Sequence, residues 1–163
     1  MIVAAAMAII SSTLAGCGPS DIPISTRTET EMPVYAEKSG SGERRSDVEP
    51  LARRFPLIGE PVAAVWYAGT MGSEDVPGPS TYWIDAVVTV DADTAAQIEA
   101  SYGLQPTDDV PEVIDSLKAD VPVGLWASPD FNRALTMGGN PSFTTIAYYS
   151  PATRQIVISA LGQ

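Results

Sequence analysis

The chain has 163 residues, of which 45% are hydrophobic and 18% are charged, and its formal net charge is −11 at pH 7. This length and composition are typical of one globular domain with a single core. The sequence has no histidine and one cysteine, which excludes a Ser-His-Asp triad, a histidine-ligated zinc site, a histidine general base and an internal disulfide.

The first feature along the chain is an uncharged apolar run over residues 2–10, followed by Leu14-Ala15-Gly16-Cys17. This stretch resembles the signal peptide and lipobox of bacterial lipoproteins. The resemblance implies that residues 1–16 are cleaved off and that Cys17 is lipidated and becomes the new N-terminus. It also implies a lipid-anchored protein on the extracytoplasmic face of the cell membrane, since two acyl chains hold a protein stably where one does not.

The start of this signal is atypical, because no charged residue precedes Asp21 whereas secretory signals normally begin with basic residues. Two explanations remain open. Either the true start codon lies upstream of Met1, or the initiator amine supplies the only positive charge. A soluble secreted protein and a membrane-spanning helix are the alternatives to lipidation, and the apolar run is too short for the roughly 20 residues that a span needs.

Residues 17–54 are rich in Ser, Thr, Glu, Gly and Pro and contain no run that could bury an apolar face. This composition predicts a lipidated, disordered tether. Its arginine pairs, Arg44-Arg45 and Arg53-Arg54, either contact an anionic membrane, at about 1 kcal/mol per charge, or compensate neighbouring acidic residues.

Residues 55–163 are expected to form an acidic domain. They contain three basic and thirteen acidic residues, whereas residues 18–54 contain six basic and seven acidic residues. Nucleic acid is therefore excluded as a partner, because its phosphates are bound through clustered Lys and Arg.

Four segments of this domain have the pattern of β-strands. Residues 82–90 alternate between an apolar core face that begins with Tyr82 and a second face that carries Trp83 and Asp85. The other three segments are apolar, aromatic or β-branched runs at residues 62–68, 143–149 and 155–161.

Between the strands expected at residues 82–90 and 143–149, apolar residues recur at helical spacing and predict two helices. The first helix is expected to end at Tyr102, with Gly103 as its left-handed C-terminal residue. Its candidate N-caps are Asp91, Asp93 and Thr94. The second is expected to have Thr107 or Asp109 as its cap and Pro111 in its first turn, and to stop before Pro122.

The remaining segments give weaker signals, a short strand at residues 123–126 and one or two helical turns at 129–135. We therefore expect an α+β domain with two layers, in which a four-stranded antiparallel sheet carries two helices on one face. The expected order of elements is β-β-α-α-β-β.

Little in the sequence indicates catalysis. It contains no Walker loop, dinucleotide fingerprint or GxSxG motif, so no cofactor is expected. Two groups of acidic residues could act as an acid–base pair or hold calcium. The first is Asp91 and Asp93 with Glu99, and the second is Asp108 and Asp109 with Glu112 and Asp115. Acids at helix N-termini are, however, expected from capping alone, so no catalytic or metal site is assigned. Lys118, a candidate for a Ser/Lys pair, is expected on a solvated helix face.

The best candidate for a binding surface is a set of residues on the aromatic-rich strands beside the loop of residues 70–81, since Trp and Tyr are enriched at interfaces. The candidates are Trp66, Tyr67, Tyr82, Trp83, Asp85 and Trp126. Two alternatives remain open: the aromatic residues fill the core, and Asp85 marks the solvent face of the sheet.

Residues 69–72 and 76–83, Gly-Thr-Met-Gly and Val-Pro-Gly-Pro-Ser-Thr-Tyr-Trp, resemble segments of uncharacterised actinobacterial lipoproteins, a family that implies no known activity. We therefore expect a non-catalytic, lipid-anchored binding or interaction module of the cell envelope, with the membrane and an envelope protein or peptide as its partners. A carboxylate-dependent hydrolase of an envelope substrate and a structural subunit of an envelope assembly are the alternatives.

Overall fold

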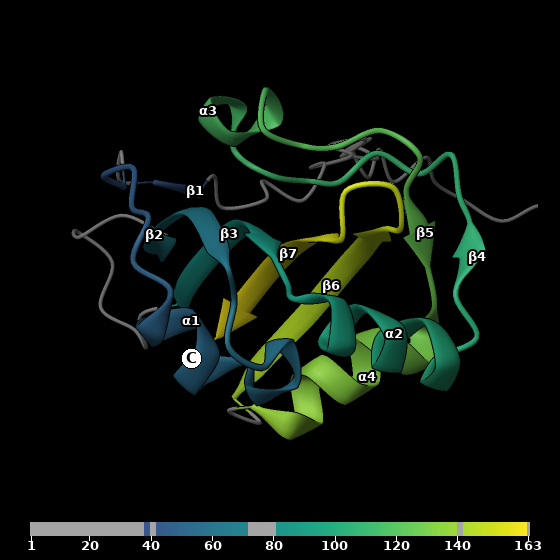
Figure 1. Ribbon diagram of the computed structural model, residues 1–163. Coiled ribbons are helices and arrows are strands. Elements are labelled where there is room, and N and C mark those ends of the chain that lie inside the picture. Colours follow the sequence, from purple (N-terminus) through teal and green to yellow (C-terminus); the bar gives the residue numbers. More distant parts are fainter. Residues whose placement is uncertain (1–37, 40–41, 72–80, 140–141, 163) are drawn as a thin grey trace, which may run out of the picture. The chain divides into compact units, whose positions relative to one another are not determined.

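A computed structural model describes residues 38–39, 42–71, 81–139 and 142–162, all within the second of the two units of the chain, Tyr35–Gln163. These residues form a seven-stranded antiparallel sheet, four α-helices and a 3₁₀-helix (Figure 1). The elements in chain order are β1 (Lys38–Ser39), α1 (Glu49–Arg54), the 3₁₀-helix η1 (Pro56–Ile58), β2 (Ala63–Met71), β3 (Thr81–Thr89), α2 (Ala92–Ser101), β4 (Gln105–Pro106), α3 (Asp115–Lys118), β5 (Trp126–Ala127), α4 (Pro129–Gly138), β6 (Phe143–Ser150) and β7 (Gln155–Gly162).

Four long strands form the centre of the sheet, in the order β2-β3-β7-β6. They lie where the alternating and β-branched runs of the sequence predict strands. The register pairs Asp85 on β3 with Tyr67 on β2 and with Ser159 on β7. These three side chains therefore lie on the same face, in the middle of the sheet.

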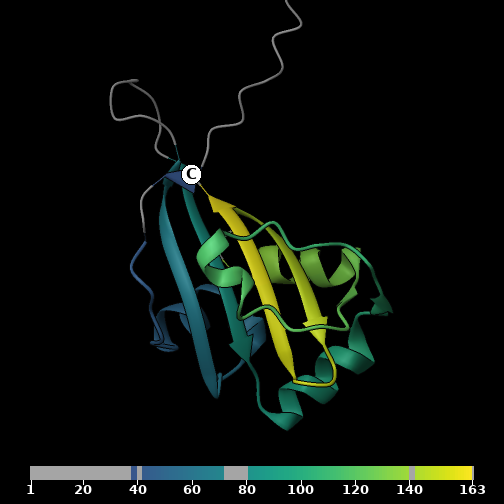
Figure 2. The same ribbon diagram turned by 90° about the horizontal axis from the view of Figure 1, so that it is seen from above.

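The predicted four-stranded sheet and its β-β-α-α-β-β order are wrong. The sheet continues beyond its four central strands through β1 at one edge and β5 and β4 at the other, in the order β1-β2-β3-β7-β6-β5-β4. These three strands are two residues long, too short to produce a periodic signal in the sequence. The expectation of two helices on one face is also wrong, because α1, α2 and α4 lie on one face and α3 lies on the other (Figures 1 and 2).

The first face of the sheet carries the larger core. Ile84, Ala86 and Val88 of β3 pack there with residues of the covering helices, among them Ile98 of α2 and Phe131 of α4. Asp91 is the N-cap of helix α2, and its carboxylate accepts a hydrogen bond from the Thr94 N–H. The helix ends before Gly103, which has the expected left-handed φ of 55°. The larger core on this face holds the central strands in position.

The second face, expected to meet solvent, carries a second core. Tyr67, Trp83 and Val157 of the sheet pack there against Val113 and Leu117. The chain between β4 and β5, residues 107–125, supplies this cover, and we call it the strap. Figure 2 shows it leaving β4, crossing the sheet to α3 and returning to β5. Both faces of the central strands are therefore covered, at least in part.

The expected boundary at residue 54 falls inside the folded unit. Leu51 of α1 and Phe55 are each 1% exposed and belong to the larger core. Arg45 pairs with Trp66 at the outer edge of β2. The sequence did not predict this packing, because the apolar residues of this segment are few and lie among charged ones. A six-residue helix also has too few turns to display an amphipathic face. The rest of the expected tether, residues 17–37, lies outside the described residues.

The second predicted helix, expected between its cap at Thr107 or Asp109 and Pro122, is mostly absent, since only Asp115–Lys118 is helical. Ile114 at its N-cap is extended, with ψ of 151°, and its N–H donates to the carboxylate of Asp85. A bond to the sheet thus replaces the helical bonding of this segment. The strap follows the sheet for this reason.

Candidate functional site

Asp85 is the charged centre of the second face. Its side chain is 0% exposed, and its two carboxylate oxygens accept hydrogen bonds from the Lys38 ammonium at 2.7 and 2.8 Å. The Ile114 N–H donates a third bond at 2.8 Å. A buried carboxylate without such partners is costly. The expectation that Asp85 marks a solvent face is therefore wrong: the strap and β1 enclose it and satisfy its charge.

Lys38 also brings a serine into this cluster. Its ammonium donates to the Glu112 carbonyl at 3.0 Å and to the Ser159 hydroxyl at 3.2 Å, and that hydroxyl donates to the same carbonyl at 3.1 Å. A serine nucleophile needs a neighbouring base that accepts its proton. Here Lys38 donates to a paired carboxylate and Ser159 donates to a carbonyl. The arrangement fits a clamp that binds β1, β3, β7 and the strap together.

A second clamp holds the other end of the strap. The Arg44 guanidinium forms two bonds to the Asp120 carboxylate, at 2.8 and 3.1 Å. The hydrogen bond with Asp120 raises the pKa of Arg44 most, and a hydrogen bond with the hydroxyl of Tyr67 raises it further. The segment that precedes α1 therefore fixes the strap at both Glu112 and Asp120, and the strap position depends on residues that the sequence predicts to be disordered.

An open groove of about 430 Å³ lies where the strap leaves part of the second face uncovered. We call it the strap groove. Its lining residues are Lys38, Asp109, Val110, Glu112, Thr144, Ile146, Tyr148, Ser159 and Leu161. Val110, Ile146 and Leu161 are 79%, 49% and 39% exposed. The groove thus has apolar side chains from the strap, β6 and β7 that meet solvent.

The rim of the strap groove is negative. Asp109 and Glu112 line it from the strap, and their carboxylates form no salt bridge with another described residue. Burial raises the pKa of Tyr148, and the charges of Asp109 and Glu112 raise it further. The Lys38 ammonium also lines the groove but is paired with Asp85. Two uncompensated carboxylates therefore set the sign of the potential at this groove.

The predicted aromatic binding surface is wrong. Trp66, Tyr67 and Trp83 are 4%, 7% and 0% exposed, because both faces of the central strands are covered. Trp66 lies in the larger core and donates its indole N–H to the Asp47 carbonyl at 2.9 Å, whereas Tyr67 and Trp83 lie in the second core. Buried aromatic side chains on opposite faces of one sheet form no common surface.

Two members of that predicted set remain accessible but are not brought together. Tyr82 is 50% exposed near the start of β3, opposite Gly162. Trp126 is half-buried in β5, opposite Tyr149, and packs against the larger core. Most of the loop beside which the surface was expected, residues 72–80, lies outside the described residues, as does Cys17.

The two acidic groups of the sequence serve different purposes. Asp91 caps α2, and Glu99 accepts a bond from the buried Tyr149 hydroxyl at 2.7 Å. Asp115 pairs with Lys118 at 2.7 Å, so Asp91, Glu99 and Asp115 each have a structural partner. Within the described ranges no three acidic side chains gather to hold a metal ion. In the first group, Asp91 is a helix cap and Glu99 bonds the Tyr149 hydroxyl. In the second group, Asp109 and Glu112 line the strap groove.

Apart from Asp109 and Glu112, the residues that line the strap groove were not predicted from the sequence. The signal was present in β6, where Ile146 and Tyr148 alternate with Ala147 and Tyr149, so that apolar residues occupy both faces. Such a strand needs cover on both sides. No comparable signal in the sequence indicated the contribution of Lys38, because this residue lies in a polar segment that is far along the chain from the other residues of the groove.

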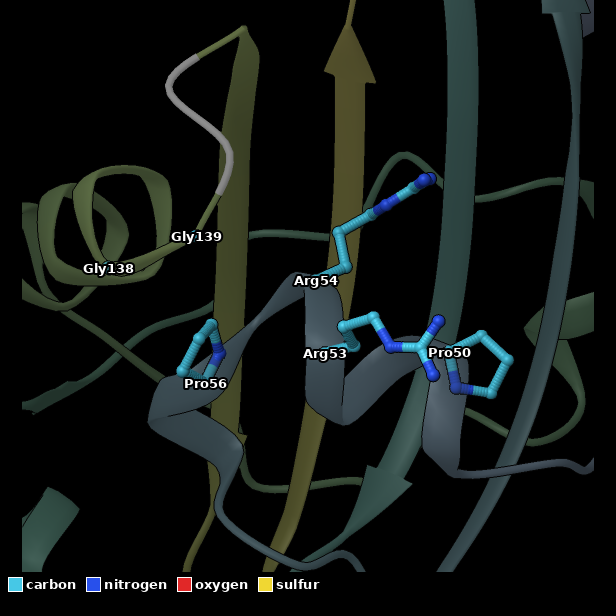
Figure 3. A pocket seen from close by; sticks show the side chains of 6 residues that line it. All are labelled: Pro50, Arg53, Arg54, Pro56, Gly138 and Gly139. Atoms are coloured by element: carbon cyan, nitrogen blue, oxygen red, sulfur yellow. The ribbon is translucent and has the colours of Figure 1, made fainter.

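A shallow basic cleft lies on the opposite side of the sheet, between α1 and the end of α4. Arg53 and Arg54 extend away from Gly138 and Gly139 (Figure 3). Arg53 pairs with Glu49, and the Arg54 guanidinium lies 5.0 Å from the centre of the Phe143 ring. Both arginines of this cleft therefore already have partners.

No protein-family model, curated protein or solved structure matches the chain. In the part of the chain that the structure describes, no helix has the length and hydropathy needed to cross a membrane.

Proposed function

We propose that the protein is a lipid-anchored binding module on the extracytoplasmic face of the cell membrane, and that it takes its partner in the strap groove. One observation carries the binding function: the exposed side chains of Val110, Ile146 and Leu161 line a single groove. Exposed apolar side chains scattered singly are normal, whereas those that gather in a groove mark interaction sites.

The anchor rests on the sequence Leu14-Ala15-Gly16-Cys17. If residues 18–37 form a flexible chain, its root-mean-square span is roughly 25 Å. The folded unit would then remain close to the bilayer, where other envelope proteins are its potential partners.

Replacing Cys17 with Ala tests the anchor. The variant is expected to lose both incorporation of labelled palmitate and fractionation with membranes, because the acylated sulfur is gone. Ser20→Ala, which leaves the lipobox intact, is the control and should retain both. Persistence of label and membrane association in the Cys17 variant would refute lipidation.

Site-specific cross-linking in cells tests the binding function. A photoreactive amino acid at position 146, in the strap groove, is expected to give a discrete adduct. The same amino acid at position 62 is the control, because Val62 is 67% exposed but lies outside the groove. Equal adducts from both positions, or none from position 146, would contradict a binding role for the groove.

A carboxylate-dependent hydrolase is the second candidate, because Asp109 and Glu112 line the same groove. It predicts that the protein releases soluble products from purified envelope fragments and that Asp109→Asn and Glu112→Gln each abolish this release. Release that survives in both variants would dismiss this candidate.

A further inference from the structure

We propose that the partner bound in the strap groove is an extended, basic peptide segment with apolar side chains, belonging to another envelope protein. This inference rests on the proposed binding function and specifies the chemistry of the partner. Its basis is the combination of an acidic rim, an apolar floor and a blocked strand edge.

The charge of the groove selects a cationic partner. Asp109 and Glu112 have no ion pair with any described residue, and the nearby Lys38 is neutralised by Asp85. Residues 55–163 carry thirteen acidic against three basic residues, so the longer-range field has the same sign. Such a field raises the association rate of cations and disfavours anions.

The floor of the groove requires more than charge. Ile146 and Leu161 are half exposed in the floor, and Val110 projects from the strap beside them. A purely hydrophilic cation would leave these side chains in water. Burying apolar surface contributes roughly 25 cal/mol per Å², so a partner that carries both apolar and basic side chains fits the groove better.

The spacing of the floor favours an extended partner. Thr144, Ile146 and Tyr148 are alternate residues of β6 and all line the groove. They repeat at about 7 Å, twice the rise of one strand residue. The side chains of an extended peptide on one face have the same repeat, so apolar residues at every second position can contact them in succession.

Addition of the peptide to the edge of β6 is blocked. The Thr145 N–H donates to the Thr136 hydroxyl at 3.2 Å, and the Ala147 N–H donates to the Asn132 side chain at 2.9 Å. Both acceptors belong to α4, which therefore satisfies the backbone donors that an added strand would need. Recognition must proceed through side chains on the face of the sheet.

The protein itself offers poor alternative occupants. Residues 18–37, which directly precede the lining residue Lys38, contain four acidic residues and one basic residue, Arg27. Their charge is of the wrong sign. A second copy of the folded unit has the same drawback, since it presents the same acidic surface. Charge complementarity thus points to a different protein.

The test uses the full-length protein in neutral phosphatidylcholine nanodiscs and three labelled pentapeptides, with empty nanodiscs as the blank. The probes alternate lysine, glutamate or serine with leucine: Lys-Leu-Lys-Leu-Lys, Glu-Leu-Glu-Leu-Glu and Ser-Leu-Ser-Leu-Ser. Fluorescence anisotropy measures binding. The lysine peptide is expected to bind most tightly, with an affinity that falls as salt is added.

Variants locate this binding. Asp109→Asn/Glu112→Gln is expected to weaken binding of the lysine peptide about tenfold, as for two exposed ion pairs. Glu60→Gln/Asp93→Asn changes the net charge equally at exposed positions outside the groove and should leave the affinity unchanged. Ile146→Ser should weaken binding of both the lysine and serine peptides, whereas Val62→Ser should not.

Several outcomes would overturn the proposal. Equal binding of the lysine and serine peptides would show that the partner need not be basic, although the groove would remain a binding site. An equal loss of lysine-peptide affinity in the Glu60→Gln/Asp93→Asn control would show that the effect comes from net charge rather than from the groove. A dimer that Ile146→Ser disrupts would make a second copy the occupant, and tighter peptide binding after deletion of residues 18–37 would make that segment the occupant. The binding function itself is contradicted by the cross-linking experiment in cells, if position 146 gives no adduct or no more adduct than position 62.

Discussion

Lys38 and Asp85 are 47 residues apart in the sequence, and their side chains form an ion pair at 2.7 Å beneath the strap. Lys38 belongs to the edge strand β1, and Asp85 to β3 in the centre of the sheet. The segment that follows the proposed anchor is therefore joined by this pair to the central strands of the sheet. The pair also fixes one wall of the strap groove.

Removing Lys38 should destabilise the protein more than removing the whole ion pair. Lys38→Met leaves the buried Asp85 carboxylate with only the Ile114 N–H, and we expect a loss of about 3–5 kcal/mol in the free energy of unfolding. Lys38→Met/Asp85→Asn should recover at least half of it, because the amide oxygen still accepts from Ile114 without a charge. Urea unfolding measures both. A double variant as unstable as the single one would contradict the importance of the unpaired charge.

Gly42 should tolerate no side chain. A Cβ at this position would lie 2.5 Å from the Ala68 carbonyl oxygen and 3.0 Å from its nitrogen. Gly42→Ala must therefore push the segment around residue 42 away from β2, and we expect it to lower the free energy of unfolding by about 1–3 kcal/mol. Gly138→Ala is the matched control, because its Cβ meets no atom within 4 Å. The melting temperature should fall only for Gly42→Ala, and equal melting temperatures would refute the close approach.

Loss of the second clamp should loosen the strap without unfolding the sheet. Arg44→Gln removes the ion pair with Asp120. Amide hydrogen exchange is then expected to accelerate at Thr107, whose N–H bonds to the Leu125 carbonyl at the base of the strap. Exchange in β7 should not change. Arg133→Gln, which removes a pair within α4, is the control and should leave exchange at Thr107 as it is.

Tyr148 should titrate above the ordinary tyrosine pKa of about 10, because burial and the charges of Asp109 and Glu112 all disfavour its ionised form. Since its pKa is raised in the folded state, its contribution to stability is complete below about pH 10. It is lost as the pH rises through the folded-state pKa.

Nuclear magnetic resonance of ¹³Cζ-labelled tyrosine, assigned with Tyr148→Phe, measures this pKa. Asp109→Asn/Glu112→Gln should lower it only in part, because burial remains. Saturation with the lysine peptide should lower it as well. A pKa that neither treatment changes would show that the two carboxylates do not act on Tyr148.

Asp91 should make stability pH-dependent in acid. Hydrogen bonds from the Thr94 backbone N–H and hydroxyl lower the pKa of its carboxyl. Its contribution is therefore present above the unfolded-state pKa of about 3.9 and is lost as the pH falls through the lower folded-state pKa. Asp91→Asn keeps the cap but does not titrate, so the stability difference from the native protein should shrink in acid.

Local sequence signals were sufficient for the longer elements. The alternation in residues 82–90 corresponds to β3, and Asp91 and Gly103 mark the two ends of α2 as N-cap and left-handed C-terminal residue. In each case the preference of a few adjacent residues decides the structure. Strand count and layer arrangement could not be predicted in this way, because two-residue strands form only when a neighbouring strand offers its backbone.

The sequence alone also indicated the acidity of the domain and the lipobox at Cys17, which remains a prediction. Tertiary structure decided which acidic and aromatic residues face solvent. Trp83 and Asp85 share a strand face that looks solvent-exposed in isolation, yet the strap buries both. The physical reason is distance along the chain: the cover comes from Lys38, Arg44 and residues 107–125, whose role depends on contacts across the sheet rather than on their sequence neighbours.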